Sequence, residues 1–240
     1  GGGDALIYHT LLGQDRQNFL RRCPPNRAIS AVADLPGCPP SRRARHLRRE
    51  LKFLMAGLSY KMSCDHIFKY VIIGDRGVGK SCLALRFTDN IFQAVHKITI
   101  GMEFDKRTIN VGSKTIKLHI WDMSSDDTFR SIAKLYYSWA ACLLLVYDVT
   151  RRETFTHVAT WLKENREHAS ANVTIVLIGN KCDLSDRRAV TYEEGEQFSI
   201  EHELLFIETS AKTAENVEKA FVGTSEIVLK NVEDGLLELF

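Results

Sequence analysis

Long apolar runs and paired cysteines are both lacking in this 240-residue sequence, and each absence excludes a class of protein. The longest uninterrupted apolar run, Trp139–Tyr147, has nine residues, whereas a membrane-spanning helix needs about 20. The six cysteines form no CxxC pair and have no histidine at metal-ligand spacing. This pattern argues against a disulfide framework or a zinc site and favours a reducing cytosolic setting. All five prolines lie between residues 24 and 40.

Charge is unevenly distributed, although the formal net charge is only +2. Residues 1–61 contain 11 Lys and Arg against 4 Asp and Glu, whereas residues 62–240 contain 21 against 26. The acidic body therefore has no charge excess suited to nucleic acid. Apolar residues make up 45% of the chain and charged residues 26%, which is the ordinary balance of a soluble globular protein.

Residues 1–64 differ from the rest of the chain and form a basic leader rich in proline and arginine. Patterning begins only at residues 46–61, where leucines and Met55 fall on one face of a basic helix. We expect a disordered or adventitious leader, with an Arg-rich transit peptide and a membrane-surface helix over 46–61 as open alternatives. Either Met55 or Met62 is a candidate start of the folded part.

From Ile67 onward, apolar strands alternate with amphipathic helices. We expect strands at Phe68–Gly74, Met102–Val111, Thr115–Trp121, Leu143–Val149, Val173–Gly179 and Leu204–Thr209, the second and third forming a hairpin. Helices are expected at Ser81–Phe87 and at about 152–168, 191–203 and 213–231. This order predicts an α/β domain over 65–232, with a mostly parallel six-stranded sheet, one antiparallel strand and helices on both faces. A short C-terminal remnant at 233–240 follows it.

Residues 74–81, GDRGVGKS, fit the phosphate-binding pattern G-x-x-x-x-G-K-[ST] between a predicted strand and a predicted helix. Such a loop wraps a polyphosphate with its backbone N–H groups, because glycines stand where a Cβ would collide. Lys80 would supply a charge to the β- and γ-phosphates, and the Ser81 hydroxyl can ligate Mg²⁺. The residues expected at the phosphates are Gly77, Val78, Gly79, Lys80, Ser81 and Cys82.

A second motif, Asn180-Lys181-Cys182-Asp183, follows the predicted strand Val173–Gly179, at the edge where open α/β sheets bind ligands. The Asp183 carboxylate can accept hydrogen bonds from the ring N–H and the exocyclic amine of guanine, whereas adenine offers no such pair of donors. Asn180 and Lys181 would support the loop and lie along the base. Ser210-Ala211-Lys212, after the next strand, would supply a second wall.

With these motifs, the chain from about Cys64 to Val232 resembles a Rab small GTPase and is most similar to the branch of endoplasmic reticulum–Golgi traffic. The runs IGMEF (100–104), KLHIWD (117–122) and LLVYDVT (144–150), with 187–198, carry the same resemblance. It implies a monomeric GTP/GDP switch of intracellular vesicle traffic, cytoplasmic and at the endoplasmic reticulum or Golgi surface. An exchange factor and effectors would bind its switch loops, at about 93–104 and 122–137.

The same resemblance implies roles for further residues. Ser81, Thr99 and Asp122 would hold Mg²⁺, and Phe92 would cover the guanine ring. Phe104, Trp121 and Tyr136 would form the aromatic surface for effectors, although hairpin core is an equally good interpretation of Trp121.

The sequence departs from the family where GTP is hydrolysed. Rab proteins usually read Asp-Thr-Ala-Gly-Gln-Glu, whereas here Asp122 is followed by MSSDD. Asp126 thus takes the place of the glutamine that orients the attacking water, and Ser125 that of a glycine. Arg76 replaces a small residue near the γ-phosphate. It would block an activating partner, act on the γ-phosphate in cis, or pair with Asp126; we favour the block.

The catalytic set predicted from these departures is Asp126, Lys80 and Arg76, with impaired hydrolysis. Downstream, Ser138-Trp139 stands where Arg-Gly is usual, and the chain ends in LLELF without the family's prenylated cysteines. We therefore expect no lipid anchor in this chain. A slow GTPase switch, a non-hydrolysing GTP-bound scaffold and a truncated gene product stay open as hypotheses.

Overall fold

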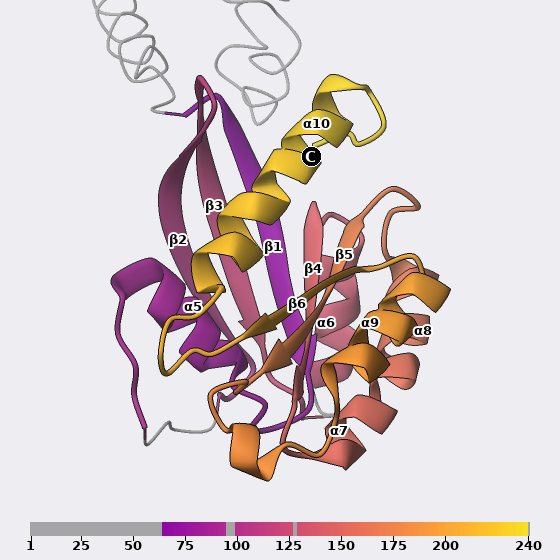
Figure 1. Ribbon diagram of the computed structural model, residues 1–240. Helices are drawn as coiled ribbons and strands as arrows, with labels where there is room; N and C mark the ends of the chain where they lie inside the picture. The colour runs from indigo at the N-terminus through magenta and orange to yellow at the C-terminus, as the bar shows by residue number, and fades with distance from the viewer. Residues whose placement is uncertain (1–63, 95–98, 127–128, 240) are drawn as a thin grey trace, which may run out of the picture. The chain divides into compact units, whose positions relative to one another are not determined.

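The computed structural model describes residues 64–94, 99–126 and 129–239 (Figure 1). The predicted leader lies outside the described residues, apart from Cys64. The strands are β1 (His66–Gly74), β2 (Met102–Val111), β3 (Lys114–Met123), β4 (Cys142–Asp148), β5 (Thr174–Asn180) and β6 (Leu205–Thr209). The helices are α5 (Lys80–Asp89), α6 (Arg130–Tyr137), α7 (Arg152–Thr156), α8 (Val158–His168), α9 (Tyr192–Glu201) and α10 (Thr224–Glu233).

Within these residues, six strands form one sheet in the order β2-β3-β1-β4-β5-β6. Only β2 runs antiparallel, with Met102 opposite Met123 and Val111 opposite Lys114, and the other neighbours are parallel. The predicted hairpin turns at Gly112, whose φ of +57° favours glycine. The predicted α/β fold is confirmed.

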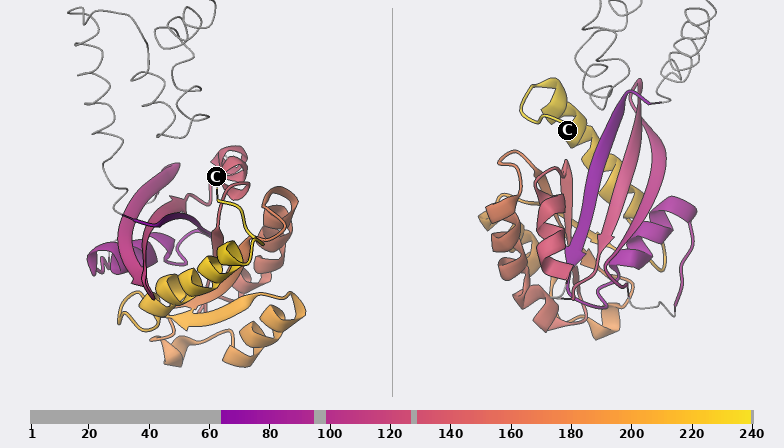
Figure 2. Two further views of the ribbon diagram at one scale, coloured as in Figure 1. Left: turned by 90° about the horizontal axis from the view of Figure 1, so that it is seen from above. Right: turned by 180° about the vertical axis from the view of Figure 1, so that it is seen from behind.

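Helices cover both faces of the sheet (Figures 1 and 2). Because strand side chains alternate, Phe68, Tyr70 and Ile72 of β1 pack toward α5 and α10, whereas Val71 and Ile73 pack toward α6 and α8. The buried Tyr70 hydroxyl lies 3.0 Å from Thr224 Oγ1 and 2.9 Å from Ser225 Oγ in α10. Two apolar layers therefore enclose the sheet and hold its strand ends in place.

The loops that follow β1, β5 and β6 carry the predicted nucleotide motifs. These three strands are parallel, so their carboxyl ends meet at one edge of the sheet, at the bottom of Figure 1. The topology thus brings together segments that lie more than 100 residues apart, such as Val78 and Asn180.

Three local predictions were wrong. The second switch region, expected as a loop over about 122–137, contains helix α6, whose Ala133 and Tyr137 are buried one turn apart. The helix expected at 213–231 starts only at Val217 and is π-helical over Lys219–Gly223, because Ala214 and Asn216 have positive φ. The helix expected at 152–168 is two helices that meet at His157.

The chain remains packed after α10. Gly235, at φ +71°, ends the helix in a Schellman motif, in which the Leu236 N–H donates to the Asn231 carbonyl at 2.8 Å. Leu237 is buried in the core beneath α10, and Asn172 Nδ2 donates to the Leu236 carbonyl at 2.6 Å. The packed residues therefore extend beyond the predicted boundary at 232.

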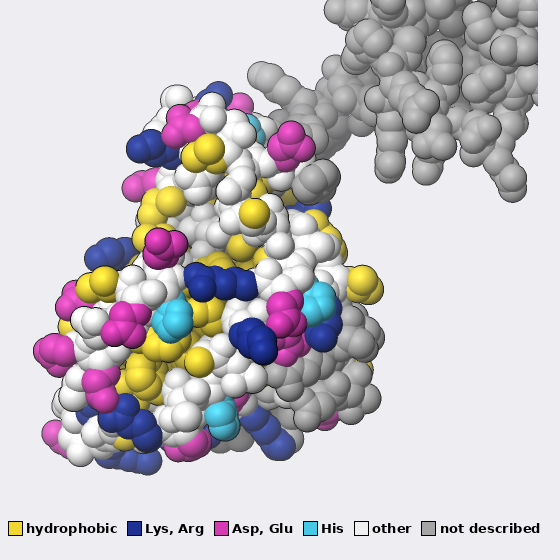
Figure 3. Space-filling view, turned by 90° about the vertical axis from the view of Figure 1, so that its right-hand side faces the viewer, with side chains coloured by type: hydrophobic (Ala, Val, Ile, Leu, Met, Phe, Trp, Pro, Cys, Tyr) yellow, Lys and Arg dark blue, Asp and Glu magenta, His cyan; other side chains and the backbone are white. Residues whose placement is uncertain are grey.

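The face formed by α8 and α9 shows hydrophobic side chains between charged ones (Figure 3). Phe155 of α7, Phe198 of α9 and Leu204, which precedes β6, are half-buried and pack against the core, and Phe155 and Phe198 stack edge to face at 5.7 Å. Among the described residues, no helix combines the length and apolar character that crossing a bilayer requires.

Candidate functional site

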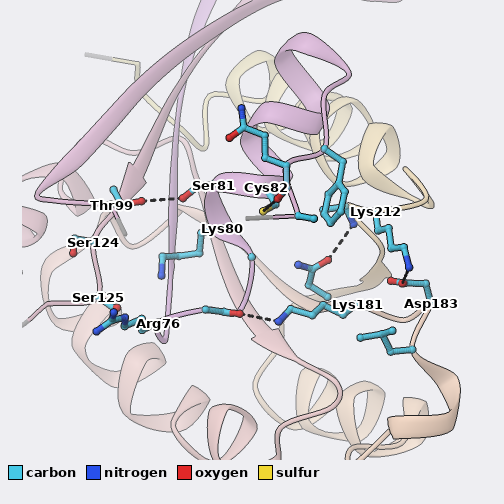
Figure 4. Close-up of a pocket in the computed structure, with 18 of the residues that line it drawn as sticks. Arg76, Lys80, Ser81, Cys82, Thr99, Ser124, Ser125, Lys181, Asp183 and Lys212 are labelled. Atoms are coloured by element: carbon cyan, nitrogen blue, oxygen red, sulfur yellow. Dashed lines mark hydrogen bonds and ion pairs between the residues drawn. The ribbon is translucent and has the colours of Figure 1, made fainter. Parts of the chain in front are cut away.

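A pocket of about 630 Å³ opens at the carboxyl edge of the sheet (Figure 4). It is lined by Arg76, Gly77, Gly79, Lys80, Ser81, Cys82, Phe92, Gln93, Ala94, Thr99, Met123, Ser124, Ser125, Asn180, Lys181, Asp183, Leu184, Ala211 and Lys212. Of the predicted site residues, all line this pocket except Val78, Asp122, Asp126 and Ser210. Motifs distant in the sequence therefore converge on one site.

The loop after β1 is shaped by its glycines. Gly79 has φ +97°, and a Cβ on it would lie 2.3 Å from Asn180 Nδ2. Helix α5 starts directly after Gly79, with no described side chain capping it and no acidic residue in its first turn. Its first N–H groups therefore lack helical partners and, with the helix dipole, favour an anion at this point.

Lys80 is held beneath the loop. Its ammonium donates to the carbonyls of Gly74 at 2.8 Å and Asp75 at 2.9 Å. Burial lowers the pKa of Lys80 to about 8, although the carboxylates of Asp122 and Asp75 act in the opposite direction. The pocket thus holds a desolvated cation whose charge a phosphate would stabilise.

Three oxygen-bearing side chains meet beside Lys80. The Ser81 hydroxyl lies 2.9 Å from Thr99 Oγ1 and donates to Asp122 Oδ2, and Thr99 Oγ1 donates to the same oxygen at 3.3 Å. The other oxygen, Asp122 Oδ1, is buried and has no hydrogen-bond partner among the described residues. Burial raises the pKa of Asp122, partly offset by Ser81 and Lys80. Hydroxyl and carboxylate oxygens suit Mg²⁺, so these residues fit the predicted ion.

The other end of the pocket is built from the loops after β5 and β6. Asn180 Nδ2 donates to the Val78 carbonyl at 2.8 Å, and its Oδ1 accepts from Ala211 N at 3.3 Å, so Asn180 joins three loops. Asp183 Oδ1 accepts from Ser210 Oγ at 2.6 Å, and Lys212 Nζ lies 4.0 Å from Asp183 Oδ2. The hydrogen bond from Ser210 thereby orients the Asp183 carboxylate and occupies its Oδ1.

The comparison with known families agrees with this arrangement. A family model described as the Ras family matches residues 69–230. This chain belongs to the Ras family. It is a small GTPase of the α/β P-loop fold, and Ras-family members bind GTP and GDP, typically with Mg²⁺, and interact with regulators and effectors.

The carboxylate of Asp148, which sequence reasoning missed, supports the Ras-family pocket through two cations. Asp148 is 1% exposed at the end of β4, and its Oδ2 lies 2.6 Å from Lys181 Nζ and 3.2 Å from Arg151 Nε. Lys181 also donates to the Gly77 carbonyl and Arg151 to the Arg76 carbonyl, both at 2.8 Å. Asp148 thus positions two cations that hold consecutive carbonyls of the phosphate loop. The sequence run LLVYDVT contains Asp148, but the run alone did not indicate a role for this residue.

A second missed contact ties the phosphate loop to α8. The Asp75 carboxylate accepts from Trp161 Nε1 at 2.8 Å and lies 2.6 Å from His157 Nδ1. Asp75 stands at a variable position of the loop pattern, so only the fold could reveal its partners. Leu184, next to Asp183, also lines the pocket and carried no sequence signal.

The residues predicted to affect hydrolysis lie in two places. The exposed Arg76 lines the pocket together with Ser124 and Ser125. Asp126 lines a small adjoining void that shares Met123, Ser124 and Ser125 with the pocket, and its backbone N–H donates to Ser124 Oγ at 3.2 Å. The structure therefore brings Arg76 and Lys80 into the pocket and places Asp126 directly after two residues of its wall.

Phe92 and Cys82 both line the pocket wall. Phe92 packs against the core cluster beneath α5. Burial raises the pKa of the Cys82 thiol, whose sulfur lies 3.8 Å from the Gln93 carbonyl. This cysteine is therefore a neutral, packed part of the wall.

The aromatic residues predicted for effectors are contiguous. Trp121 is 9% exposed, and its ring lies 5.1 Å from that of Phe104 and 5.9 Å from that of Tyr136. Phe104 is 48% exposed. Trp121 is thus largely core, as one of its two interpretations required, while Phe104 offers the open surface.

Proposed function

We propose that this chain is a Rab-like guanine-nucleotide switch of vesicle traffic between endoplasmic reticulum and Golgi, which hydrolyses GTP slowly. The observation that carries the slow hydrolysis is the aspartate at position 126, which directly follows Ser124 and Ser125 of the pocket wall that Arg76 also lines. The Rab identity is supported by the motif runs of the sequence and by the contiguous rings of Phe104, Trp121 and Tyr136.

Mg²⁺ is part of this proposal. Ser81, Thr99 and Asp122 would hold the ion, and the unpartnered Asp122 Oδ1 supports that assignment. When bound, Mg²⁺ neutralises charge on the β- and γ-phosphates. Lys80 adds its own charge, and Asn180 and Asp183 fix the base, so the chain's residues position GTP at both ends.

Slow hydrolysis follows from what phosphoryl transfer requires. Its rate depends on positioning the water and on stabilising charge that spreads over the phosphate. Asp126 adjoins the pocket, and its exposed carboxylate is one methylene shorter than a glutamine side chain and cannot donate a hydrogen bond when ionised. It therefore positions that water poorly and opposes the developing charge. By analogy with removing one preorganised donor, we expect a loss of about 10²-fold or more.

A four-way comparison tests the proposal by single-turnover hydrolysis of γ-labelled GTP. The wild type is compared with Asp126→Gln, Arg76→Thr and the double variant. We expect Asp126→Gln to accelerate hydrolysis and the double variant to be fastest. A wild type that already reaches the rate of the Gln variant contradicts the proposal. If Arg76→Thr slows hydrolysis, Arg76 acts on the γ-phosphate in cis rather than as a block.

A GTP-holding scaffold that hydrolyses nothing is the second candidate. It is favoured by Arg76, whose bulk lines the phosphate end of the pocket. Undetectable turnover in all four variants, with tight GTP binding, would select it. The traffic role has its own test: the tagged full chain is expected to co-localise with endoplasmic reticulum or Golgi markers, and a purely nuclear or mitochondrial location would contradict it.

A further inference from the structure

The half-buried side chain of Arg86, in the last turn of α5, joins this helix to the loop after β6, which passes beside α5 in Figure 1. Its Nε donates to the Ala211 carbonyl at 2.8 Å, and its Nη2 donates to the Lys212 carbonyl at 3.1 Å. Among the described residues, no other donor bonds to either carbonyl. Arg86 therefore satisfies two consecutive backbone groups of this loop.

Arg86 is also held on its own helix. Its Nη1 donates to the carbonyl of Asn90 at 2.9 Å and to the Oδ1 of Asn90 at 3.0 Å. A cation at this point is favourable, because the dipole of α5 is negative at its C-terminus. The guanidinium thus makes four hydrogen bonds, nearly all that its planar fork can donate. Its position is therefore fixed relative to α5.

The loop that Arg86 holds contains the base wall, defined here as Ala211 and Lys212, which both line the pocket. The Ala211 N–H donates to Asn180 Oδ1 at 3.3 Å, so the base wall lies against the loop after β5. Further along, Ala214 has φ +68° and Asn216 has φ +54°, conformations that residues other than glycine adopt at a cost. A loop with two such residues needs contacts outside itself to keep one conformation.

Helix α5 connects the two ends of the pocket. Lys80 and Ser81 begin the helix beside the phosphate loop, and Arg86 lies six residues after Lys80, which is about 9 Å along the helix axis. Because the helix is continuous over this length, Lys80 and Arg86 keep a fixed separation. The same helix therefore sets the distance between the phosphate loop and the base wall.

A second arginine at the end of α5 separates this arrangement from simple stabilisation of the helix. Arg107 of β2 donates to the Phe87 carbonyl at 2.6 Å and pairs with Glu218 at 2.6 Å. In the described part of the chain, it makes no hydrogen bond or ion pair with residues 210–212. Arg86 and Arg107 line one open groove of about 370 Å³. Arg107 is thus a matched control, and the groove gives small solutes access to Arg86.

We propose that Arg86 is a positioning residue for nucleotide binding, which holds the base wall at a fixed distance from Lys80 and so keeps it closed on guanine. This proposal rests on the proposed function, because that function assigns this end of the pocket to the base. Without the guanidinium, the carbonyls of Ala211 and Lys212 lose their donor and the base wall opens more often. The nucleotide then leaves faster, although the phosphate loop is intact.

Release of a fluorescent GDP analogue from the full chain is the first test. We expect Arg86→Ala to release the analogue about tenfold faster than the wild type, because two charge-assisted hydrogen bonds are lost at a partly exposed site. Arg86→Lys should restore only part of the loss, since an ammonium lacks the planar fork that reaches two carbonyls. Arg107→Ala should release the analogue at the wild-type rate, even where it lowers the melting temperature.

Chemical rescue distinguishes a missing guanidinium from a loosened fold. Guanidinium chloride at millimolar concentration should slow release from Arg86→Ala, because the cation enters the open groove and donates to the same carbonyls. Ammonium chloride at the same ionic strength should not slow it. Neither salt should change release from Arg107→Ala.

A double-mutant cycle with Asp183→Ala determines whether Arg86 acts through the base. Asp183→Ala removes the carboxylate that the proposed function assigns to guanine, so a closed base wall contributes less to retention. Adding Arg86→Ala to this variant should therefore accelerate release much less than Arg86→Ala does in the wild type.

Hydrogen exchange of the emptied full chain, followed by mass spectrometry, tests the anchor without any nucleotide. The backbone amides of residues 210–213 should exchange several-fold faster in Arg86→Ala than in the wild type. Arg107→Ala should leave their exchange unchanged.

Any of four results would overturn the proposal: release from Arg86→Ala at the wild-type rate, no rescue by guanidinium, full additivity in the cycle, or unchanged exchange over residues 210–213. The failure of the proposed function is a different outcome. A wild type that shows the expected exchange difference from Arg86→Ala, but binds adenine and guanine nucleotides equally well, contradicts only the proposed function.

Discussion

Replacing Asp148 by asparagine tests how the pocket is held together. The amide side chain would keep the shape but remove the charge that Lys181 and Arg151 share at 2.6 and 3.2 Å. Those cations hold the carbonyls of Gly77 and Arg76. We therefore expect Asp148→Asn to loosen the phosphate loop and to speed nucleotide release.

The exposure of the two partners sets the magnitude. Removing one member of a fully buried pair costs about 3–5 kcal/mol, but the side chains of Lys181 and Arg151 are 33% and 37% exposed. Each interaction is therefore discounted toward the surface value of up to about 1 kcal/mol. The sum, about 1–2 kcal/mol, corresponds to about 5- to 30-fold faster release if it acts wholly on the bound state.

Release of a fluorescent GDP analogue measures this effect, with thermal unfolding as a second readout. Arg152→Ala is the control, because its exposed pair with Glu194 lies away from the pocket. Hydrogen bonds outweigh burial and lower the pKa of Asp148 in the folded chain. The stabilisation that ionised Asp148 gives the folded chain is thus complete at pH values above the ordinary Asp pKa of 3.8. It is lost as the pH falls below that value. The reasoning would be refuted if Asp148→Asn and Arg151→Ala both released the GDP analogue at a rate within twofold of that of the wild type.

Three further predictions concern the pocket. Asp183→Ala should weaken GTP binding by at least tenfold while leaving ATP binding weak, because the donors of guanine lose a charged acceptor worth about 1.5–3 kcal/mol; competition assays measure this. Nucleotide affinity should fall as pH rises above about 8, because phosphate binding requires protonated Lys80, and calorimetry of Lys80→Arg should show no such fall. Gly79→Ala should lower the melting temperature by roughly 2–12 °C, since its φ of +97° and the contact with Asn180 impose strain of about 1–3 kcal/mol.

The sequence predicted the sheet and most of the pocket, because both depend on local patterns. The buried run of β4, CLLLVYD, and the alternation of the hairpin mark strands directly. The phosphate loop is recognisable because its glycines occupy fixed positions in the motif. In the structure Gly79 lies against Asn180, so the two motifs form one site.

Features that depend on tertiary contacts escaped sequence reasoning. The role of Asp148 exists only because the loops after β4, β5 and β1 meet, and Asp75 finds Trp161 and His157 from a helix that starts more than 80 residues later. Helix α6 was missed since its segment was assigned as a loop by resemblance. The role of Asp126 was assigned from its position in a motif and stays a prediction.

The most direct test of the central claim is to identify the nucleotide that the full chain retains. The protein is purified in Mg²⁺, denatured, and its released nucleotide is separated by ion-exchange chromatography and identified by mass spectrometry. The account predicts GTP or GDP in a near-equimolar amount, lost on purification in a chelator and absent from Asp183→Ala. Retention of an adenine nucleotide, or ATP competing on equal terms with GTP for the emptied chain, would contradict it.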